Sequence, residues 1–432
     1  MNKRLLLNIF LVVFIDLLGF GLILPLLPYY ADAFGASDFL TGLLVASYAA
    51  AQLVGAPLLG RLSDRYGRRP ILLVSIAGTS LGFLLLGVAG PLGQLIAGGS
   101  AALASTITLA LLFASRVIDG LTGGNISVAQ AYISDVTDEG NRARALGLVG
   151  AAFGLGFIIG PAAGGFLSQW GYAVPAFVAA GLAALNWLGV LAFLPESLTV
   201  QQRADNLARQ VAAGRPRFTL GALKAALNRP KVGPLLHITF FFGLAFVMFQ
   251  TMFTLYTKNR FELEAQANGY MLAYVGLLSV LVQGVAIGPL TRRFSENTIT
   301  LAAIGLMALG LLGWALAPSI PVLLVVLALV ALAGGVLNTT LRSSITKAVT
   351  RDEVGGVLGL QNAVESATRV IAPSLGGLLI GQFGTAAPGL AGAALLALLF
   401  SFTWRRLMRA RQAGGPPAAP QGAPRPADAP LE

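Results

Sequence analysis

The side chains in this sequence that could do chemistry are charged residues inside long apolar segments, beginning with Asp16, Arg116 and Asp119. A charge within an apolar span is costly, so it points to a function by default. A carboxylate such as Asp16 can exchange a proton when it is unpaired, or act as a fixed structural partner when it is paired. Arg116 stays charged, so its movement relative to Asp16 would decide when that carboxylate holds a proton. Asp119 follows on the same helix face and could instead neutralise Arg116.

A second pair of charges, Glu365 and Arg369, interrupts another apolar segment near the C-terminus. Their spacing places them one helical turn apart, which favours an ion pair within the helix and lowers the cost of burying either charge. The alternative is that they contact a substrate. The sequence favours the structural pair and leaves substrate contact open.

Membrane-spanning helices must position these residues. The chain has 432 residues, of which 56% are hydrophobic and 11% charged, and its mean hydropathy is +0.77. Soluble proteins carry about 25% charged residues. Apolar stretches of the length that crosses a bilayer predict an all-α polytopic membrane protein with twelve transmembrane helices. We expect them at residues 5–30, 40–60, 70–98, 107–133, 143–167, 173–195, 233–257, 267–289, 298–318, 321–341, 354–380 and 384–407.

The distribution of basic residues predicts the orientation. Of the 29 Lys and Arg residues, Lys258 and Arg260 fall on one side, Arg116 and Arg369 fall within spans, and all others fall on the opposite side. By the positive-inside rule both termini are cytoplasmic, and the expected location is the plasma (inner) membrane. The high pI therefore reports topology and does not imply nucleic acid as a partner.

Several functions are excluded or disfavoured by what the sequence lacks. It has no cysteine, so no disulfide and no thiolate metal site can form. It offers no cluster of catalytic residues, no metal-ligand spacing and no phosphate loop, so we expect neither an enzyme nor a bound cofactor or metal.

The chain divides into two related halves. We expect an N-terminal six-helix half at 1–195, a cytoplasmic linker at 196–232, a C-terminal six-helix half at 233–410 and a disordered tail at 411–432. Glycine and proline positions near residues 147–165 recur at equal spacing as Gly359, Pro373, Gly376 and Gly377. The first half carries extra sequence, which we place at 91–106. Such a repeat predicts pseudo-symmetric halves with a path between them.

A polar loop between two spans carries a specific pattern. Residues 60–69 read Gly-Arg-Leu-Ser-Asp-Arg-Tyr-Gly-Arg-Arg, and this string closely resembles the signature loop of the major facilitator transporters. The resemblance implies a conformational latch, a charge cluster that joins the cytoplasmic ends of the two halves, with the loop aspartate facing the start of the eleventh span. Its expected members are Gly60, Asp64, Gly67, Arg68, Arg69 and Asp135.

The fifth span contains a glycine string that resembles the motif marking antiporters in that family. Glycines at four-residue spacing make a flat face for close helix packing, and a proline bends the helix. A common small-residue packing face is the plainer interpretation of the glycines alone. The motif residues are Gly147, Gly156, Gly160, Pro161, Gly164 and Gly165.

The first span and Gln52, which precedes Ala56-Pro57, resemble the tetracycline-efflux branch of the twelve-span drug:proton antiporters. This resemblance implies that Asp16, Arg116 and Asp119 couple transport to protons. It also implies multidrug efflux, a role in antibiotic resistance, and function as a monomer in membrane lipid.

Acids in spans three and nine and a histidine in span eight, which the tetracycline pumps carry, are missing here. A lipophilic drug-like small molecule is therefore the preferred substrate; the alternative is a facilitator or proton symporter of another small solute.

Polar residues in or beside the spans are candidates to line a substrate cavity, although several could serve only as hydrogen-bonding contacts between helices. The expected cavity residues are Gln52, Asn125, Gln250, Asn338, Gln361, Glu365 and Arg369.

Overall fold

The computed structural model describes residues 3–212, 220–350 and 353–412, and these form helices without a strand. The first half contains α1 (Lys3–Ile23), α2 (Leu27–Asp32), α3 (Asp38–Tyr66), α4 (Arg68–Ile96), α5 (Ala101–Thr122), α6 (Asn125–Val136), α7 (Glu139–Leu167), the short η1 (Ser168–Trp170) and α8 (Ala173–Phe193). The linker contains α9 (Val200–Ala212) and α10 (Leu220–Leu227). The second half contains α11 (Gly233–Phe261), α12 (Ala265–Leu281), the π-turn η2 (Val282–Ala286), α13 (Ile287–Arg293), α14 (Glu296–Leu316), α15 (Ile320–Lys347), α16 (Val354–Phe383) and α17 (Ala387–Gln412).

The predicted all-α membrane fold is confirmed. Within the described residues, 11 helical segments are long and apolar enough to cross a membrane. α16 is not one of these 11, but it is 30 residues long and packs between α3 and α11, so we count it as the twelfth span. The predicted tail falls mostly on residues 413–432, outside the described residues, and α17 continues to Gln412.

Two predicted spans are each broken into two helices. The first ends at Ile23 and restarts at Leu27, because Pro25 and Pro28 lack the backbone N–H groups that a continuous helix needs. The fourth breaks at Gly123-Gly124 between α5 and α6. Sequence reasoning missed both breaks because hydropathy continues across them.

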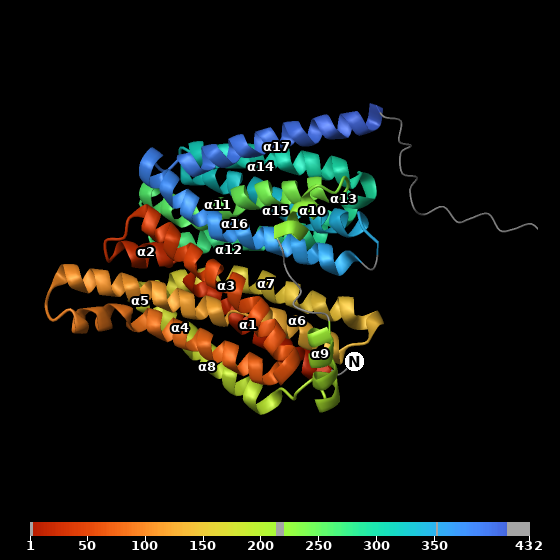
Figure 1. The fold of residues 1–432 in the computed structure, drawn as a ribbon. Coiled ribbons are helices and arrows are strands. Elements are labelled where there is room, and N and C mark those ends of the chain that lie inside the picture. Colours follow the sequence, from red (N-terminus) through yellow and green to blue (C-terminus); the bar gives the residue numbers. More distant parts are fainter. Residues whose placement is uncertain (1–2, 213–219, 351–352, 413–432) are drawn as a thin grey trace, which may run out of the picture.

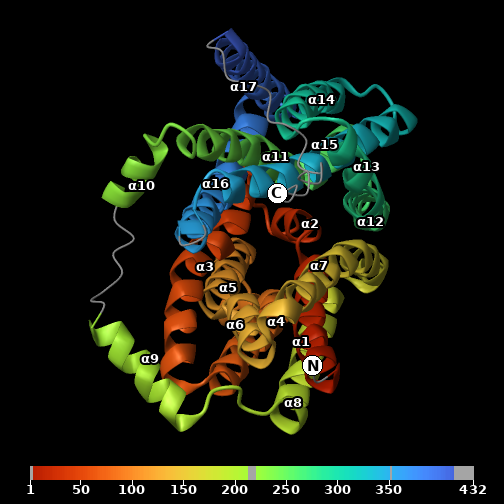
Figure 2. The ribbon, with the colours of Figure 1, turned by 90° about the vertical axis from the view of Figure 1, so that its right-hand side faces the viewer.

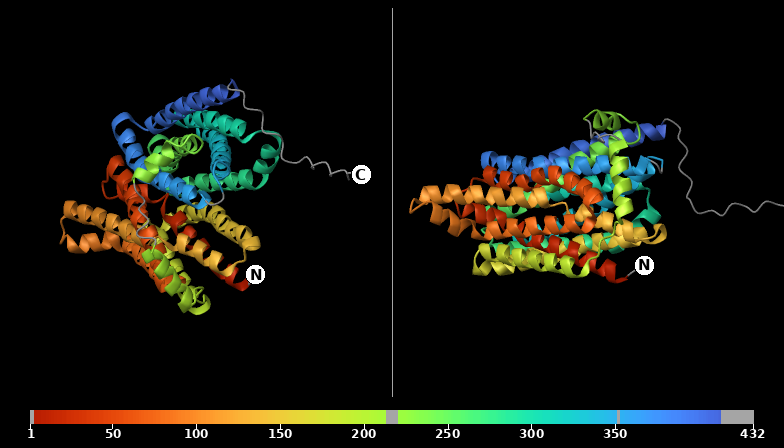
Figure 3. Two further views of the ribbon diagram at one scale, coloured as in Figure 1. Left: turned by 45° about the vertical axis from the view of Figure 1, so that its right-hand side comes forward. Right: turned by 60° about the horizontal axis from the view of Figure 1, so that its bottom comes forward.

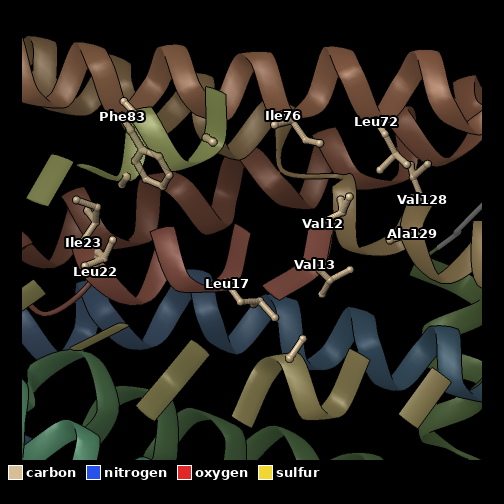
Figure 4. Packing of buried hydrophobic residues seen from close by; sticks show 14 of the residues in the cluster. Val12, Val13, Leu17, Leu22, Ile23, Leu72, Ile76, Phe83, Val128 and Ala129 are labelled. Atoms are coloured by element: carbon tan, nitrogen blue, oxygen red, sulfur yellow. The ribbon is translucent and has the colours of Figure 1, made fainter. Parts of the chain in front are cut away.

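The helices gather into two bundles, which lie one above the other in Figure 1 and can be seen from two other sides in Figure 3. One buried apolar cluster runs from Leu6 to Leu194 and another from Ile238 to Leu399. Figure 4 shows part of the first, where α1, α4 and α6 bring Val13, Ile76 and Ala129 together. The first cluster lies within residues 1–195 and the second within residues 233–410, and the predicted division of the chain at these bounds stays a prediction.

The two ends of the bundles differ. The described N-terminus, α9 and α10 lie at one end, which we call the linker end and predict to be cytoplasmic (Figures 1 and 2). At the far end, the turn between α4 and α5 extends past the other helices. Residues 91–106, where the sequence predicts an insertion, lie in this projection, and the turn contains Gly98 and Gly99 in the positive-φ region that favours glycine.

Candidate functional site

A cavity of about 290 Å³ lies between the two halves. Helices α1, α3, α5 and α7 line it from one side, and α11, α15 and α16 line it from the other. Six of the seven polar residues that the sequence predicted for a cavity line it, and so do two of the predicted proton-coupling residues, Asp16 and Arg116. The six are Gln52, Gln250, Asn338, Gln361, Glu365 and Arg369. The remaining wall is rich in aromatic rings, which are Phe20, Tyr48, Phe153, Phe157, Phe242 and Phe246. An apolar chamber with a few convergent polar groups is typical of a small-molecule site.

Asp16 of α1 and Arg116 of α5 both line the cavity, and Asp119 is the ion-pair partner of Arg116 on α5. Their coupling to protons stays a prediction. Arg116 Nη1 lies 3.1 Å from Asp119 Oδ2, and both side chains are almost fully buried. The Arg116 guanidinium also lies over the ring of Phe83, 5.3 Å from its centroid. The Arg116 Nε and Nη2 atoms have no hydrogen-bond partner in the described structure, so this guanidinium is only partly satisfied.

Asp16 faces the cavity from α1 and makes no ion pair with any described residue. Its polar neighbours are Asn125 and Asp119. Asn125 does not line the cavity as predicted; it is buried behind Asp16 at the start of α6, which begins there because Gly123-Gly124 breaks the span. Asn125 therefore contacts the candidate proton site and not the open chamber.

The predicted ion pair between Glu365 and Arg369 is wrong. Glu365 instead lies 3.4 Å from Arg342 Nη2 of α15 and accepts a 3.0 Å hydrogen bond from Gln361 Nε2. Arg369 makes no ion pair or hydrogen bond with the described residues. The partner of Glu365 is therefore Arg342 on the neighbouring α15 and not Arg369 on α16. Spacing within α16 alone could not predict this.

The two halves meet at the far end. Gly42 of α3 packs against Pro373 of α16, and Gly377 packs against Asp38, at distances that leave no room for a Cβ atom. The Tyr29 hydroxyl donates a 2.6 Å hydrogen bond to the Leu263 carbonyl. Lys258 Nζ pairs with the Asp32 carboxylate across the same junction. The central cavity is therefore closed at this end.

At the linker end a second cavity of about 1100 Å³ separates α3 from α16. It shares Ala49, Gln52 and Arg369 with the central cavity, so the two are continuous. Its rim carries an ion pair in which Arg229 Nη2 donates a 2.6 Å hydrogen bond to Glu353, and this bond holds the pKa of Glu353 below its ordinary value. The structure is thus open toward the linker end, and we call this second cavity the vestibule.

The predicted latch residues come together in the first half. Arg68 is buried, with Nη1 lying 2.6 Å from Asp64 Oδ1 and Nε lying 3.0 Å from Asp135 Oδ2. Arg69 reaches the carbonyl of Leu191. The linker ends of α3 and α16 lie on opposite walls of the vestibule. Contact between this charge cluster and the second half therefore stays a prediction, for the opposite conformation.

Glu196 is the member of this cluster that sequence reasoning missed. Its two carboxylate oxygens accept hydrogen bonds of 2.8 Å from Arg68 N and 3.1 Å from Arg69 N, which caps the start of α4. Gly67 has a φ of +108°, and a Cβ there would collide with the Glu196 carboxylate. Gly67, the second glycine of the motif, therefore leaves the space that the Glu196 carboxylate needs to cap α4. Glu196, which accepts these hydrogen bonds, lies at the start of the linker, far from residues 60–69 along the chain. The motif alone therefore could not reveal the cap.

The glycine motif of α7 lies between α1 and α12. Gly156 and Gly160 pack against Leu17 and Gly21 of α1, and Gly165 packs against the backbone of Ala265 at the start of α12. Two further residues of α7 belong to this face. Gly164 packs against Leu22 of α1, and Pro161 packs against Gly269 of α12. Gly147 faces open space and takes no part in this packing. The motif thus joins the helix that carries Asp16 to the opposite half.

A sequence model of the Major Facilitator Superfamily matches residues 9–321 and 285–429 of the chain. The chain is 32% identical to the class C tetracycline resistance protein of Escherichia coli, covering 83% of this chain and 85% of that protein. It is also 32% identical to solute carrier family 22 member 18 of Mus musculus, covering 83% and 85%. The crystal structure of the human organic anion transporter MFSD10 superposes with a TM-score of 0.62 at 25% identity, covering 93% and 99%.

Two bundles around a central chamber that opens at one end define a membrane transport protein. The chain belongs to the Major Facilitator Superfamily. It is an integral membrane transporter of small molecules and not an enzyme, and the predicted similarity to the tetracycline-resistance proteins is confirmed.

Proposed function

We propose that this transporter expels lipophilic, drug-like small molecules from the cell in exchange for protons. The observation that carries the proposal is Asp16, an acid without an ion-pair partner among the described residues, facing a chamber walled by aromatic rings. The similarity to tetracycline-resistance proteins supports the same direction of transport. We infer an inner-membrane location with both termini cytoplasmic.

Asp16 is well placed to carry the proton. It lines the chamber that the substrate would occupy, so a proton and a cationic group of the substrate would compete for the same carboxylate. Arg116 supplies the second part of the mechanism. Its guanidinium pairs with Asp119 through Nη1, while Nε and Nη2 have no partner among the described residues, and a movement of α5 relative to α1 that brought these atoms to Asp16 would give that carboxylate a charged partner. Such a shift would favour release of the proton.

Alternating access follows from these positions. In the conformation open to the linker end, a deprotonated Asp16 would receive the substrate from the cytoplasm. In the opposite conformation, a proton from outside would displace the substrate, and the protonated, uncharged carboxyl would return inward at lower cost. The glycine face of α7 would transmit the change, because it contacts both α1 and α12.

The test is a transport measurement on the purified protein in proteoliposomes. Asp16→Asn should abolish efflux driven by a pH gradient and spare downhill exchange of substrate, because the amide keeps the shape of the carboxylate and cannot exchange a proton. Asp205→Asn, at an exposed position of α9 outside both cavities, is the matched control and should pump normally. Uphill pumping by Asp16→Asn would place the proton site elsewhere, with Glu365 and Asp119 next. Movement of protons and substrate in the same direction would favour the symporter alternative.

A further inference from the structure

We propose that the substrate is a zwitterion with an apolar body, whose anionic group binds Arg369 and whose cationic group binds Asp16. This inference rests on the proposed efflux function and adds the chemical class of the substrate. It starts from the four charged side chains that line the central cavity, Asp16, Arg116, Glu365 and Arg369.

Two of these four charges already have protein partners. Arg116 pairs with Asp119, and Glu365 pairs with Arg342 and accepts a hydrogen bond from Gln361. Asp16 and Arg369 make no ion pair with any described residue. When a charged side chain in a membrane-embedded chamber has no protein partner, a ligand or an ion must compensate its charge.

The two uncompensated charges lie on opposite halves of the protein. Asp16 comes from α1 and Arg369 comes from α16, and both face the same chamber. Tyr48 and Gln52 of α3 line the same chamber as both side chains. One small molecule with a charge at each end can therefore reach both and bridge the halves.

The chemistry of each end is distinct. Arg369 presents a planar set of N–H donors, which fits a carboxylate or another flat oxyanion better than the point charge of a lysine would. Asp16 accepts only from cations and hydrogen-bond donors while it is ionised. The rings of Phe20, Phe157 and Phe246 line the same chamber and provide an apolar surface for the body of the molecule.

The position of Arg369 also favours contact with the entering substrate. Arg369 lines both the vestibule and the central cavity, whereas Asp16 lines the central cavity alone. A molecule that arrives from the linker end therefore meets the cation first and the carboxylate deeper in the protein. This order fits a substrate that carries both charges.

The test uses three probes that share one apolar body: an aryl-piperazine carboxylic acid, its methyl ester, which keeps only the cation, and its N-acyl derivative, which keeps only the anion. Binding is measured by calorimetry on the purified full-length protein, and uptake driven by a pH gradient is measured in proteoliposomes. Wild-type protein should bind the zwitterion about tenfold more tightly than the ester, as expected for hydrogen bonds to a charged group.

Arg369→Gln should remove this preference by weakening the zwitterion about tenfold, and should leave binding of the ester unchanged. Arg369→Lys should retain part of the preference. Arg405→Gln, which removes an exposed charge from α17 outside the cavity, is the control for net charge and should behave as wild type. Size-exclusion profiles establish that each variant is folded.

The inference is overturned if wild-type protein binds the ester and the zwitterion equally or binds none of the probes, or if Arg369→Gln weakens both equally. A failure of the proposed function looks different. In that case the preference for the zwitterion and its loss in Arg369→Gln would persist in binding, but no probe would be pumped by a pH gradient.

Discussion

At the scale of single residues, the charges in this transporter are arranged by contacts between helices more than by spacing within one helix. Glu365 lies one turn from Arg369 but pairs with Arg342 of α15. Glu196, at the start of the linker, caps α4 through the backbone of Arg68 and Arg69. These contacts leave Asp16 and Arg369 as the charges that face the central cavity without a pair in the described structure.

The Glu196 cap leads to a prediction about Gly60 of α3 and Gly67, which lies between α3 and α4. Gly67→Ala should lower the free energy of unfolding by about 1–3 kcal/mol, because alanine is strained at a φ of +108° and its Cβ would collide with Glu196. Gly60→Ala is the matched control, since Gly60 lies within α3 and a Cβ there meets open space, and its thermal stability should equal or slightly exceed that of wild type. Thermal unfolding in detergent measures both. Equal melting temperatures for the two variants would contradict the role of Gly67.

At the scale of elements, α7 couples α1 to α12 through a face without side chains. Gly160 lies against Gly21 of α1, and Gly165 lies against the backbone of α12. Such close backbone contact lets helices slide with little obstruction, which suits a helix that must keep both neighbours packed while the cavity changes its opening.

This arrangement predicts a difference between two glycines on the same helix. Gly160→Leu should destabilise the protein by about 1–3 kcal/mol through overpacking against Gly21 and should lose most transport. Gly147→Leu should be tolerated, because Gly147 faces open space. Transport in vesicles, normalised to the amount of folded protein, distinguishes them. Full transport by Gly160→Leu would exclude α7 from the conformational change.

At the scale of the whole molecule, the structure is closed at the far end and open at the linker end. The Asp32–Lys258 pair and the bond from Tyr29 to Leu263 connect the halves at the closed end. The vestibule separates the same halves at the other end. Alternating access requires these contacts to separate when the linker ends come together.

The absence of cysteine from the chain makes this requirement testable. A short bis-maleimide linker joining Asp32→Cys to Lys258→Cys should stop transport, because the far end could no longer open, and cleavage of a reducible version should restore it. Each single-cysteine variant treated in the same way is the control. These two cysteines should label from outside, and a cysteine in α9 should label only from inside. Continued transport after complete cross-linking would show that the far end does not open.

The sequence by itself determined the membrane-spanning class, the twelve spans, the family and some of the polar residues that line the cavity. These follow from local patterns: hydropathy over a span, charges on one side, and short motifs such as residues 60–69. Only the tertiary structure decided which charges are paired and which are left facing the cavity. Glu365 has partners on two helices, Asn125 lies behind Asp16, and Glu196 caps a distant helix. The physical reason is that an ion pair within a membrane protein forms with the nearest partner in space, and spacing along one helix specifies only part of that neighbourhood.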